Sequence, residues 1–274
     1  MDKGDGSKMG TERSGIGGAF RRLANLLMRD GPILASQKIA RYLSWQIVAQ
    51  VRRWHIIRMP SPEARFTRIY QVNFWAAKES ASGPGSSLDD TRELRLQLPE
   101  LFRQFAITTV FDAPCGDFNW MKAVVADEPI RYIGADIVKP MIDTNIARYK
   151  NERTDFLHLD LTRGPFPKAD LWLCRDCFYH LSIADIARSL QRFLESDIPY
   201  LLASTHKAPP GPSNFDIVTG DFRFTDLFAA PFSLPRGVLF RINDNDSSDM
   251  CLWSRAQVMS RAIVRSQRSP AVGV

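Results

Sequence analysis

The stretch that decides the fold reads Val110-Phe-Asp-Ala-Pro-Cys-Gly-Asp-Phe-Asn-Trp120. An apolar run leads into Asp112, and a turn that contains Gly116 follows. A second apolar run ends at Asp136, which lies 24 residues after Asp112. In open α/β sheets, ligands bind at the carboxyl ends of parallel strands, and an acid at the end of the second strand accepts hydrogen bonds from ribose hydroxyls. The pattern therefore predicts a site for a nucleoside-containing cofactor.

The composition of the turn favours S-adenosylmethionine over NAD. A pyrophosphate needs a glycine-rich turn whose N–H groups hold it at a helix N-terminus. The turn from Asp112 to Asp117 instead has one glycine, a proline and two carboxylates. Carboxylates repel a pyrophosphate but attract an ammonium group. S-adenosylmethionine carries an ammonium, a sulfonium and a ribose but no phosphate, so a nicotinamide-dependent oxidoreductase is the weaker reading.

Alternating patterns predict an α/β fold with a doubly wound, mostly parallel sheet. We expect strands at 108–112, 131–136, 154–160, 170–175 and 200–205, and a terminal antiparallel pair at 238–243 and 250–254. Helices are expected at 63–78, 88–105, 118–126, 140–149 and 183–194. Pro99 should bend or divide the second of these helices.

The stretch around Gly116 resembles motif I of class I S-adenosylmethionine-dependent methyltransferases, in which an acid precedes a Gly-x-Gly turn. This chain departs from that motif by placing Ala113, Pro114 and Cys115 where the first glycine usually falls. It also resembles a bacterial subgroup with an "apCGdfnWm" motif I and an upstream "W-x-x-x-x-S-x-S-G-x-G-S" segment, here Trp75-Ala-Ala-Lys-Glu-Ser-Ala-Ser-Gly-Pro-Gly-Ser86. The resemblance covers roughly residues 66–255. It implies a seven-stranded Rossmann-like methyltransferase fold and methyl transfer from S-adenosylmethionine.

The resemblance implies cofactor contacts at the turn after the first strand. An acid at the position of Asp112 acts at the methionine end of the cofactor. Gly116 would give the backbone room, and the carbonyl groups of Ala113 or Cys115 could face the ammonium. Asp117 could instead cap the following helix, which is a common role for an acid at such a position.

The adenosine end of the cofactor is assigned in the same way. Asp136 would accept hydrogen bonds from the ribose hydroxyls, and Ile137 would pack on the adenine face. Asp160, at the end of the third strand, would bind the adenine amino group, with Leu161 beside it. The alternative reading of Asp136 is a solvated turn acid.

Asp176 and His180 follow the fourth strand, where methyltransferases present groups to the acceptor. The chain lacks the Asn-Pro-Pro-Tyr sequence of amino-group methyltransferases of this class, which disfavours amine chemistry on DNA. A histidine is a plausible general base for a hydroxyl acceptor, although His180 could equally pack or cap beside the strand. Arg175 could pair with Asp176 or bind an anionic substrate.

Other predicted acceptor contacts come from two segments. The serine-rich loop at 80–87 would cover the cofactor or bind a polar substrate, although such a loop is a flexible linker in most proteins. The residues after the fifth strand would line the same pocket. The full set of predicted substrate contacts is Trp75, Ser82, Gly83, Ser86, Arg175, Thr205 and His206.

Basic and acidic residues are unevenly distributed along the chain, which has 274 residues and a formal net charge of +6. Residues 1–68 hold 13 Lys or Arg against 5 Asp or Glu, and the remainder holds 23 against 25. We predict a disordered tail at 1–18, a basic helical extension at 19–60 and a methyltransferase domain at 61–274. The helices within 19–58 could make peripheral contact with an anionic membrane or pack on protein; we favour packing.

The four cysteines and four histidines do not form a pattern typical of a zinc site, so we predict no metal. No signal peptide or long apolar run is evident, and we expect a cytoplasmic protein. The sequence does not predict the oligomeric state.

Three functions remain in view. We favour methylation of a small-molecule or glycan-like acceptor, at a hydroxyl. A nucleic-acid methyltransferase would use the basic N-terminal helices for binding. A non-catalytic binding module would keep the fold without turnover.

Overall fold

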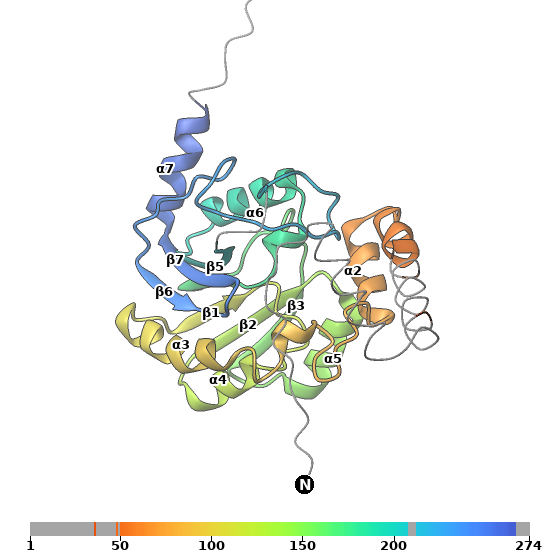
Figure 1. Cartoon of the computed structure of the whole chain (residues 1–274). Coiled ribbons are helices and arrows are strands. Elements are labelled where there is room, and N and C mark those ends of the chain that lie inside the picture. The colour runs from red at the N-terminus through yellow and green to blue at the C-terminus, as the bar shows by residue number, and fades with distance from the viewer. Residues whose placement is uncertain (1–35, 37–47, 49, 208–211, 267–274) are drawn as a thin grey trace, which may run out of the picture. The chain divides into compact units, whose positions relative to one another are not determined.

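The computed structural model describes residues 36, 48, 50–207 and 212–266. The chain divides into two units, Met1–Trp54 and His55–Val274. The described residues of the first unit are helical. The predicted tail at 1–18 and most of the predicted extension at 19–60 lie outside the described residues. The second unit holds the sheet, drawn in Figure 1.

The second unit is built on one seven-stranded sheet in the order β3-β2-β1-β4-β5-β7-β6. The first five strands in the chain pair in parallel, and β7 pairs antiparallel with both β5 and β6. This order confirms the predicted doubly wound sheet and its terminal antiparallel pair. The strands are β1 (Thr109–Asp112), β2 (Arg131–Asp136), β3 (Thr154–His158), β4 (Leu171–Cys174), β5 (Tyr200–His206), β6 (Phe240–Asn243) and β7 (Ser248–Ser254).

Helices cover both faces of this sheet (Figure 1). On one face, Leu98, Met121 and Ile142 bring three helices into one buried cluster. On the other face, Phe193 and Val258 bring two further helices into a second buried cluster. The helices are α2 (Pro62–Gln71), α3 (Arg92–Gln104), α4 (Met121–Asp127), α5 (Lys139–Tyr149), α6 (Ile183–Glu195) and α7 (Arg255–Ser266).

Successive strand residues point to opposite faces, which is why the central strands are apolar throughout. In β1, Val110 belongs to the first cluster and its neighbour Phe111 to the second. In β4, Trp172 and Leu173 divide in the same way. A strand that is covered on both faces carries apolar residues at successive positions. The continuous apolar runs in the sequence therefore predicted the strands of this sheet.

Three helix predictions need correction, the first being the helix expected at 118–126, which begins only at Met121. The helix expected at 63–78 ends at Gln71, because Asn73 and Ala76 adopt positive φ angles of 43° and 53° that stop it. The helix expected at 88–105 begins only at Arg92 and runs unbroken through Pro99. Buried leucines on both sides of Pro99 hold that helix together, so packing outweighs the lost backbone hydrogen bond.

The sheet order places the site. β1 lies between β2 and β4, so the chain leaves β1 toward one side of the sheet and enters β4 on the other. This is the switch point at which open α/β sheets bind ligands, outside the carboxyl ends of the strands. Asp112 and Asp136, the last residues of β1 and β2, both lie at this edge.

Candidate active site

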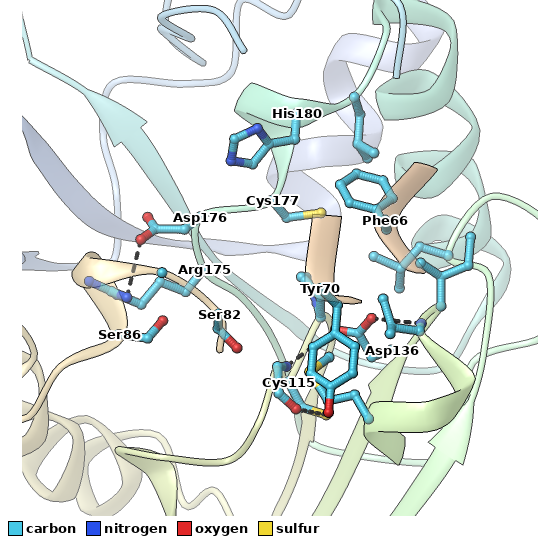
Figure 2. Close-up of a pocket in the computed structure, with 18 of the residues that line it drawn as sticks. Phe66, Tyr70, Ser82, Ser86, Cys115, Asp136, Arg175, Asp176, Cys177 and His180 are labelled. Atoms are coloured by element: carbon cyan, nitrogen blue, oxygen red, sulfur yellow. Dashed lines mark hydrogen bonds and ion pairs between the residues drawn. The ribbon is translucent and has the colours of Figure 1, made fainter. Parts of the chain in front are cut away.

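A cavity of about 410 Å³ lies at the carboxyl ends of β1, β2 and β4. Figure 2 shows side chains from helix α2, the serine-rich loop and the segment after β4 around it. All the predicted site residues line it except Ala113, Thr205 and His206. The lining residues that the sequence analysis did not name as site residues include Pro62, Phe66, Tyr70, Pro84, Gly85, Pro114, Trp120, Tyr179, Leu181, Asp185, Thr219 and Phe222.

The three predicted residues outside the lining are buried in the structure behind it. The Ala113 carbonyl accepts a hydrogen bond from the Trp172 indole at 2.9 Å, so it is already engaged. The Thr205 hydroxyl accepts the Leu227 N–H at 2.9 Å. The His206 ring nitrogen Nδ1 accepts a backbone N–H at 3.1 Å. These hydrogen bonds connect β1 and β5 to neighbouring segments, so the three residues do not contribute to the cavity wall.

Asp112 is a buried carboxyl group at the floor of the cavity. Burial raises its pKa to about 7, although the Tyr132 hydroxyl, which donates to it at 2.7 Å, acts in the opposite direction. A carboxyl group at this pKa is poised to ionise when a cation arrives.

Asp136 joins the end of β2 to the glycine turn. Its Oδ1 accepts the Val138 N–H at 2.9 Å, and its Oδ2 accepts the Gly116 N–H at 3.2 Å. Burial raises its pKa to about 6, against the lowering effect of these backbone donors. The carboxylate is therefore fixed in orientation, and each oxygen retains lone pairs for a ligand.

The serine-rich loop is anchored on the turn after β1, which the sequence analysis did not foresee. Asp117 accepts hydrogen bonds from the Ser80 hydroxyl at 2.9 Å and the Ala81 N–H at 2.7 Å. The Ser82 hydroxyl accepts the Asp117 N–H at 3.0 Å. No side chain caps the N-terminus of α4, so Asp117 holds the loop rather than the helix.

Gly116 is required at this contact. Its φ of 57° lies in the left-handed region, and a Cβ added there would lie 2.1 Å from Ser82 Oγ. Glycine thus allows the serine-rich loop to close directly on the turn. The same loop approaches the acceptor side, where a Cβ on Gly85 would lie 3.3 Å from Asp176 Oδ2.

Asp160 and Leu161 lie beyond the end of β3 and close the far end of the cavity. Asp160 Oδ1 accepts both the N–H and the hydroxyl of Thr162, at 2.8 and 2.7 Å. Its Oδ2 lies 3.5 Å from Nε of the exposed Arg163. Leu161 packs against the second core cluster. The end of β3 therefore presents one firmly held carboxylate to the cavity.

A buried ionic network lies at the end of β4. Arg175 Nη1 lies 3.1 Å from Asp176 Oδ2, an ion pair drawn in Figure 2, and Nη2 lies 3.0 Å from Asp244 Oδ2. Burial disfavours the charge on Arg175, but the two aspartates raise its pKa above its ordinary value. Burial likewise raises the pKa of Asp244 to about 6, while Arg175 opposes the shift. Arg175 is thus a permanently charged group whose partners are already in place.

Asp176 is held from several sides. Its Oδ1 accepts the Tyr179 hydroxyl and, at 3.3 Å, the Ser204 hydroxyl. Its backbone has a φ of 51°, a conformation uncommon for residues other than glycine. Such positions cluster at functional sites, where the surrounding structure imposes them. Asp176 is accordingly a positioned acceptor of hydrogen bonds.

His180 has one ring nitrogen engaged and one available to the cavity. Its Nδ1 lies 2.8 Å from the Asp221 carbonyl oxygen, which only accepts hydrogen bonds, so Nδ1 carries the proton. Burial lowers the pKa of His180, although the bond to Asp221 acts in the opposite direction. The ring is therefore neutral at pH 7, with the lone pair on Nε2. The rings of Trp75 and Phe222 each lie with their centroids 5.8 Å from it.

Among the described residues, no helix is long and apolar enough to cross a membrane. The same part of the chain holds no group of three or more His, Cys, Asp or Glu residues placed to bind a metal ion. The four cysteines are buried and unpaired.

A scan against protein-family models and a search of curated proteins found no match, so the comparison rests on structure. One similar structure is the 1,6-didemethyltoxoflavin-N1-methyltransferase of Burkholderia thailandensis, with bound 1,6-didemethyltoxoflavin and S-adenosylhomocysteine. It is 15% identical, with 70% of this chain and 86% of that chain covered and a TM-score of 0.50. The fold is that of the class I methyltransferases.

Two further structures resemble this methyltransferase fold less closely. The N-methyltransferase NodS of Bradyrhizobium japonicum, in complex with S-adenosylhomocysteine, is 13% identical over 68% of this chain and 97% of that chain, with a TM-score of 0.48. Human N-acetylserotonin methyltransferase, in complex with S-adenosylmethionine, is 16% identical over 69% of this chain and 58% of that chain, with a TM-score of 0.46.

Proposed function

We propose that the chain is an S-adenosylmethionine-dependent methyltransferase that methylates a hydroxyl group of a small molecule. The observation that carries this proposal is the pairing of Asp136 with the Gly116 N–H at the switch point of the sheet, beside the buried Asp112. This arrangement offers carboxylate oxygens to ribose hydroxyls and to a cation. The Burkholderia thailandensis structure, which contains S-adenosylhomocysteine, supports the same cofactor.

The residues present fit this cofactor better than a dinucleotide. The turn after β1 carries carboxylates, and Arg175 is the one Lys or Arg among the described residues that line the cavity. Arg175 already pairs with Asp176 and Asp244, so a pyrophosphate would find no unpaired cation there. The cofactor would be held by Asp112 and the Gly116 turn at its methionine end, and by Asp136, Ile137, Asp160 and Leu161 at its adenosine end. When bound, it supplies a methyl group on a sulfonium, which is already a good leaving group.

His180 is the residue best placed to act as general base. Its protonated Nδ1 is fixed by the Asp221 carbonyl, which leaves Nε2 to take the proton that an acceptor hydroxyl loses. The Asp176 carboxylate is already engaged by Arg175 and by the hydroxyls of Tyr179 and Ser204. We assign Asp176 the role of orienting the acceptor.

Enclosure by the loop and by α2 supports alignment of the reacting groups. The serine-rich loop lies against Gly116, and Phe66 and Tyr70 of α2 project toward the cavity in Figure 2. Holding two reactants in line and excluding water supplies much of the acceleration in a reaction of this kind. Removal of a proton is the one chemical step that the protein itself must perform.

The alternatives predict different behaviour. A nucleic-acid methyltransferase would bind RNA or DNA with an affinity that falls steeply with salt. A non-catalytic module would bind no cofactor, or bind it without turnover. Membrane contact through residues 19–58 and a cytoplasmic location remain predictions, to be tested by liposome flotation of the full chain and by cell fractionation.

The first test is calorimetric titration of S-adenosylmethionine into the full chain, with NAD as control. We expect micromolar binding of S-adenosylmethionine and no binding of NAD. Equal binding of the two, or binding of NAD alone, would refute the proposal. If neither S-adenosylmethionine nor NAD binds, the result would favour the non-catalytic binding module.

A further inference from the structure

The part of the cavity that faces His180 has mainly aromatic walls. We call it the acceptor compartment and define it by His180 and the three cavity-lining rings around it, with centroid distances to the His180 ring of 5.8 Å for Trp75, 5.8 Å for Phe222 and 6.0 Å for Tyr179. Trp75 follows α2, and Tyr179 and His180 follow β4. Phe222 comes from a distant loop and is 46% exposed, so it stands at the mouth. Flat side chains of this kind favour a flat, apolar ligand.

The charges that line the cavity disfavour an anionic acceptor. The described lining contains five carboxylates and one guanidinium group. That guanidinium, on Arg175, is paired with Asp176 and with Asp244 behind it, so the three groups together remain negative. A phosphate or carboxylate on the acceptor would meet repulsion with no unpaired cation to offset it, whereas the cofactor's carboxylate is accompanied by the cofactor's own ammonium group.

The polar groups around the compartment have little capacity left for a ligand with many hydroxyls. The Tyr179 hydroxyl donates to Asp176, and the Thr219 hydroxyl donates to Asp185. Asp185 also accepts the Ser182 hydroxyl and pairs with Arg188. Among the described contacts of the compartment, His180 Nε2 remains open as an acceptor and the Trp75 indole N–H remains open as a donor. A buried hydroxyl without a partner is costly, so a sugar would leave several of its groups unsatisfied.

We propose that the acceptor is a compact, uncharged molecule with a flat apolar body and one reactive hydroxyl, the chemistry of a phenol. The inference rests on the proposed function and narrows it, because it excludes glycans and phosphorylated or carboxylated acceptors. In the reaction, the oxygen of the acceptor forms the new bond to the methyl group, the sulfonium–methyl bond breaks, and the hydroxyl proton passes to His180 Nε2. The sulfur keeps the electron pair of the broken bond.

The test compares three probes on the full chain saturated with S-adenosylhomocysteine: 2-naphthol, 2-naphthyl phosphate and methyl β-glucopyranoside. Binding is measured by calorimetry. We expect 2-naphthol to bind with a Kd below about 1 mM, within the ligand efficiency of a small fragment. The phosphate should bind at least about 30-fold more weakly because of the repulsion, and the glucoside should show no binding.

A matched pair of variants locates the probe. Phe222→Ala should weaken 2-naphthol binding at least about fivefold, because it removes an aromatic wall. Phe215→Ala is the control, since Phe215 is 52% exposed, lies on the same loop and is outside the lining. Trp75→Leu is a second wall variant if Phe222→Ala does not fold. Affinity for S-adenosylhomocysteine should stay within about twofold in the Phe222 and Phe215 variants.

The outcomes separate this inference from the proposed function. Equal or tighter binding of the phosphate, binding of the glucoside in preference to naphthol, or no naphthol binding by a chain that binds S-adenosylhomocysteine would each overturn the acceptor class. Unchanged naphthol binding in both wall variants would do the same. Failure to bind S-adenosylhomocysteine at all would instead count against the proposed function.

Discussion

Asp136→Asn is the substitution that tests the cofactor site most directly. The side chain keeps its size but loses its charge and one acceptor oxygen. In the native protein, Oδ1 accepts the Val138 N–H and Oδ2 accepts the Gly116 N–H. An amide can satisfy one of these donors and must turn its own NH₂ toward the other. The loss therefore falls on the contact between β2 and the glycine turn, where the ribose is expected to bind.

The expected magnitude follows from the hydrogen bonds at stake. A bond to a charged group contributes about 1.5–3 kcal/mol, and a carboxylate that accepts two ribose hydroxyls makes two of them. The amide retains one acceptor, so we expect a loss of about 2–3 kcal/mol in binding, which is roughly 30- to 150-fold in Kd. Removing a buried charge also relieves its desolvation, so the variant should fold.

The assay is calorimetric titration of S-adenosylhomocysteine at pH 7.5 and pH 5.5. Because burial raises the pKa of Asp136 to about 6, the native site becomes protonated at the lower pH. The ratio of variant to native Kd should then shrink roughly fourfold between pH 7.5 and pH 5.5. Asp143→Asn is the control, because Asp143 is an exposed partner of Lys139 on α5. Native affinity in a folded Asp136→Asn protein, or a ratio that does not change with pH, would refute the assignment.

Three other substitutions test the remaining parts of the site. His180→Asn keeps a donor to the Asp221 carbonyl but removes Nε2. Initial rates of methyl transfer should therefore fall about 10²- to 10⁴-fold, while the Kd for the cofactor stays unchanged. Normal rates would refute the assignment of His180 as the general base. Burial raises the pKa of Asp112 to about 7, so the folded state holds a proton that the unfolded state releases, and stability falls as pH rises from about 4 to 7. Asp112→Asn should therefore raise the Tm of the unliganded chain by at least about 2–4 °C at pH 8 and by less at pH 5. An equal shift in Tm at both pH values would contradict this prediction. Asp117→Asn should loosen the serine-rich loop, lower stability by about 1.5–3 kcal/mol and expose residues 80–87 to limited proteolysis; unchanged cleavage and stability would mean that the anchor is unimportant.

The sheet could be predicted because its signal is local and redundant. Each central strand is a short apolar run, and β1 and β2 both end in an acid at the site. Burial on both faces forces this pattern on any sequence with this fold. Helix ends were harder, since they depend on single backbone conformations such as that of Asn73 and on packing around Pro99.

The grouping of the strand-end residues around one cavity could also be predicted from the sequence, because strand ends converge by topology alone. Ala113 shows the limit of that reasoning. It neighbours Asp112 at the end of β1, but its carbonyl bonds to the indole of Trp172. Whether a backbone group faces a ligand or the core depends on a partner from a distant strand, which a local motif does not reveal.

The acceptor compartment lay outside what sequence could predict, for the same physical reason. Phe222 contacts His180 from a loop far along the chain and belongs to no recognisable motif. His180 illustrates how such contacts create chemistry. The Asp221 carbonyl fixes its tautomer, and the Gly220 N–H donates to the His180 carbonyl at 2.7 Å. A histidine after β4 is therefore a candidate base only because a loop from far along the chain folds back against it. A substitution that displaces that loop should reduce turnover while leaving the contacts of Asp136 and the affinity for the cofactor unchanged.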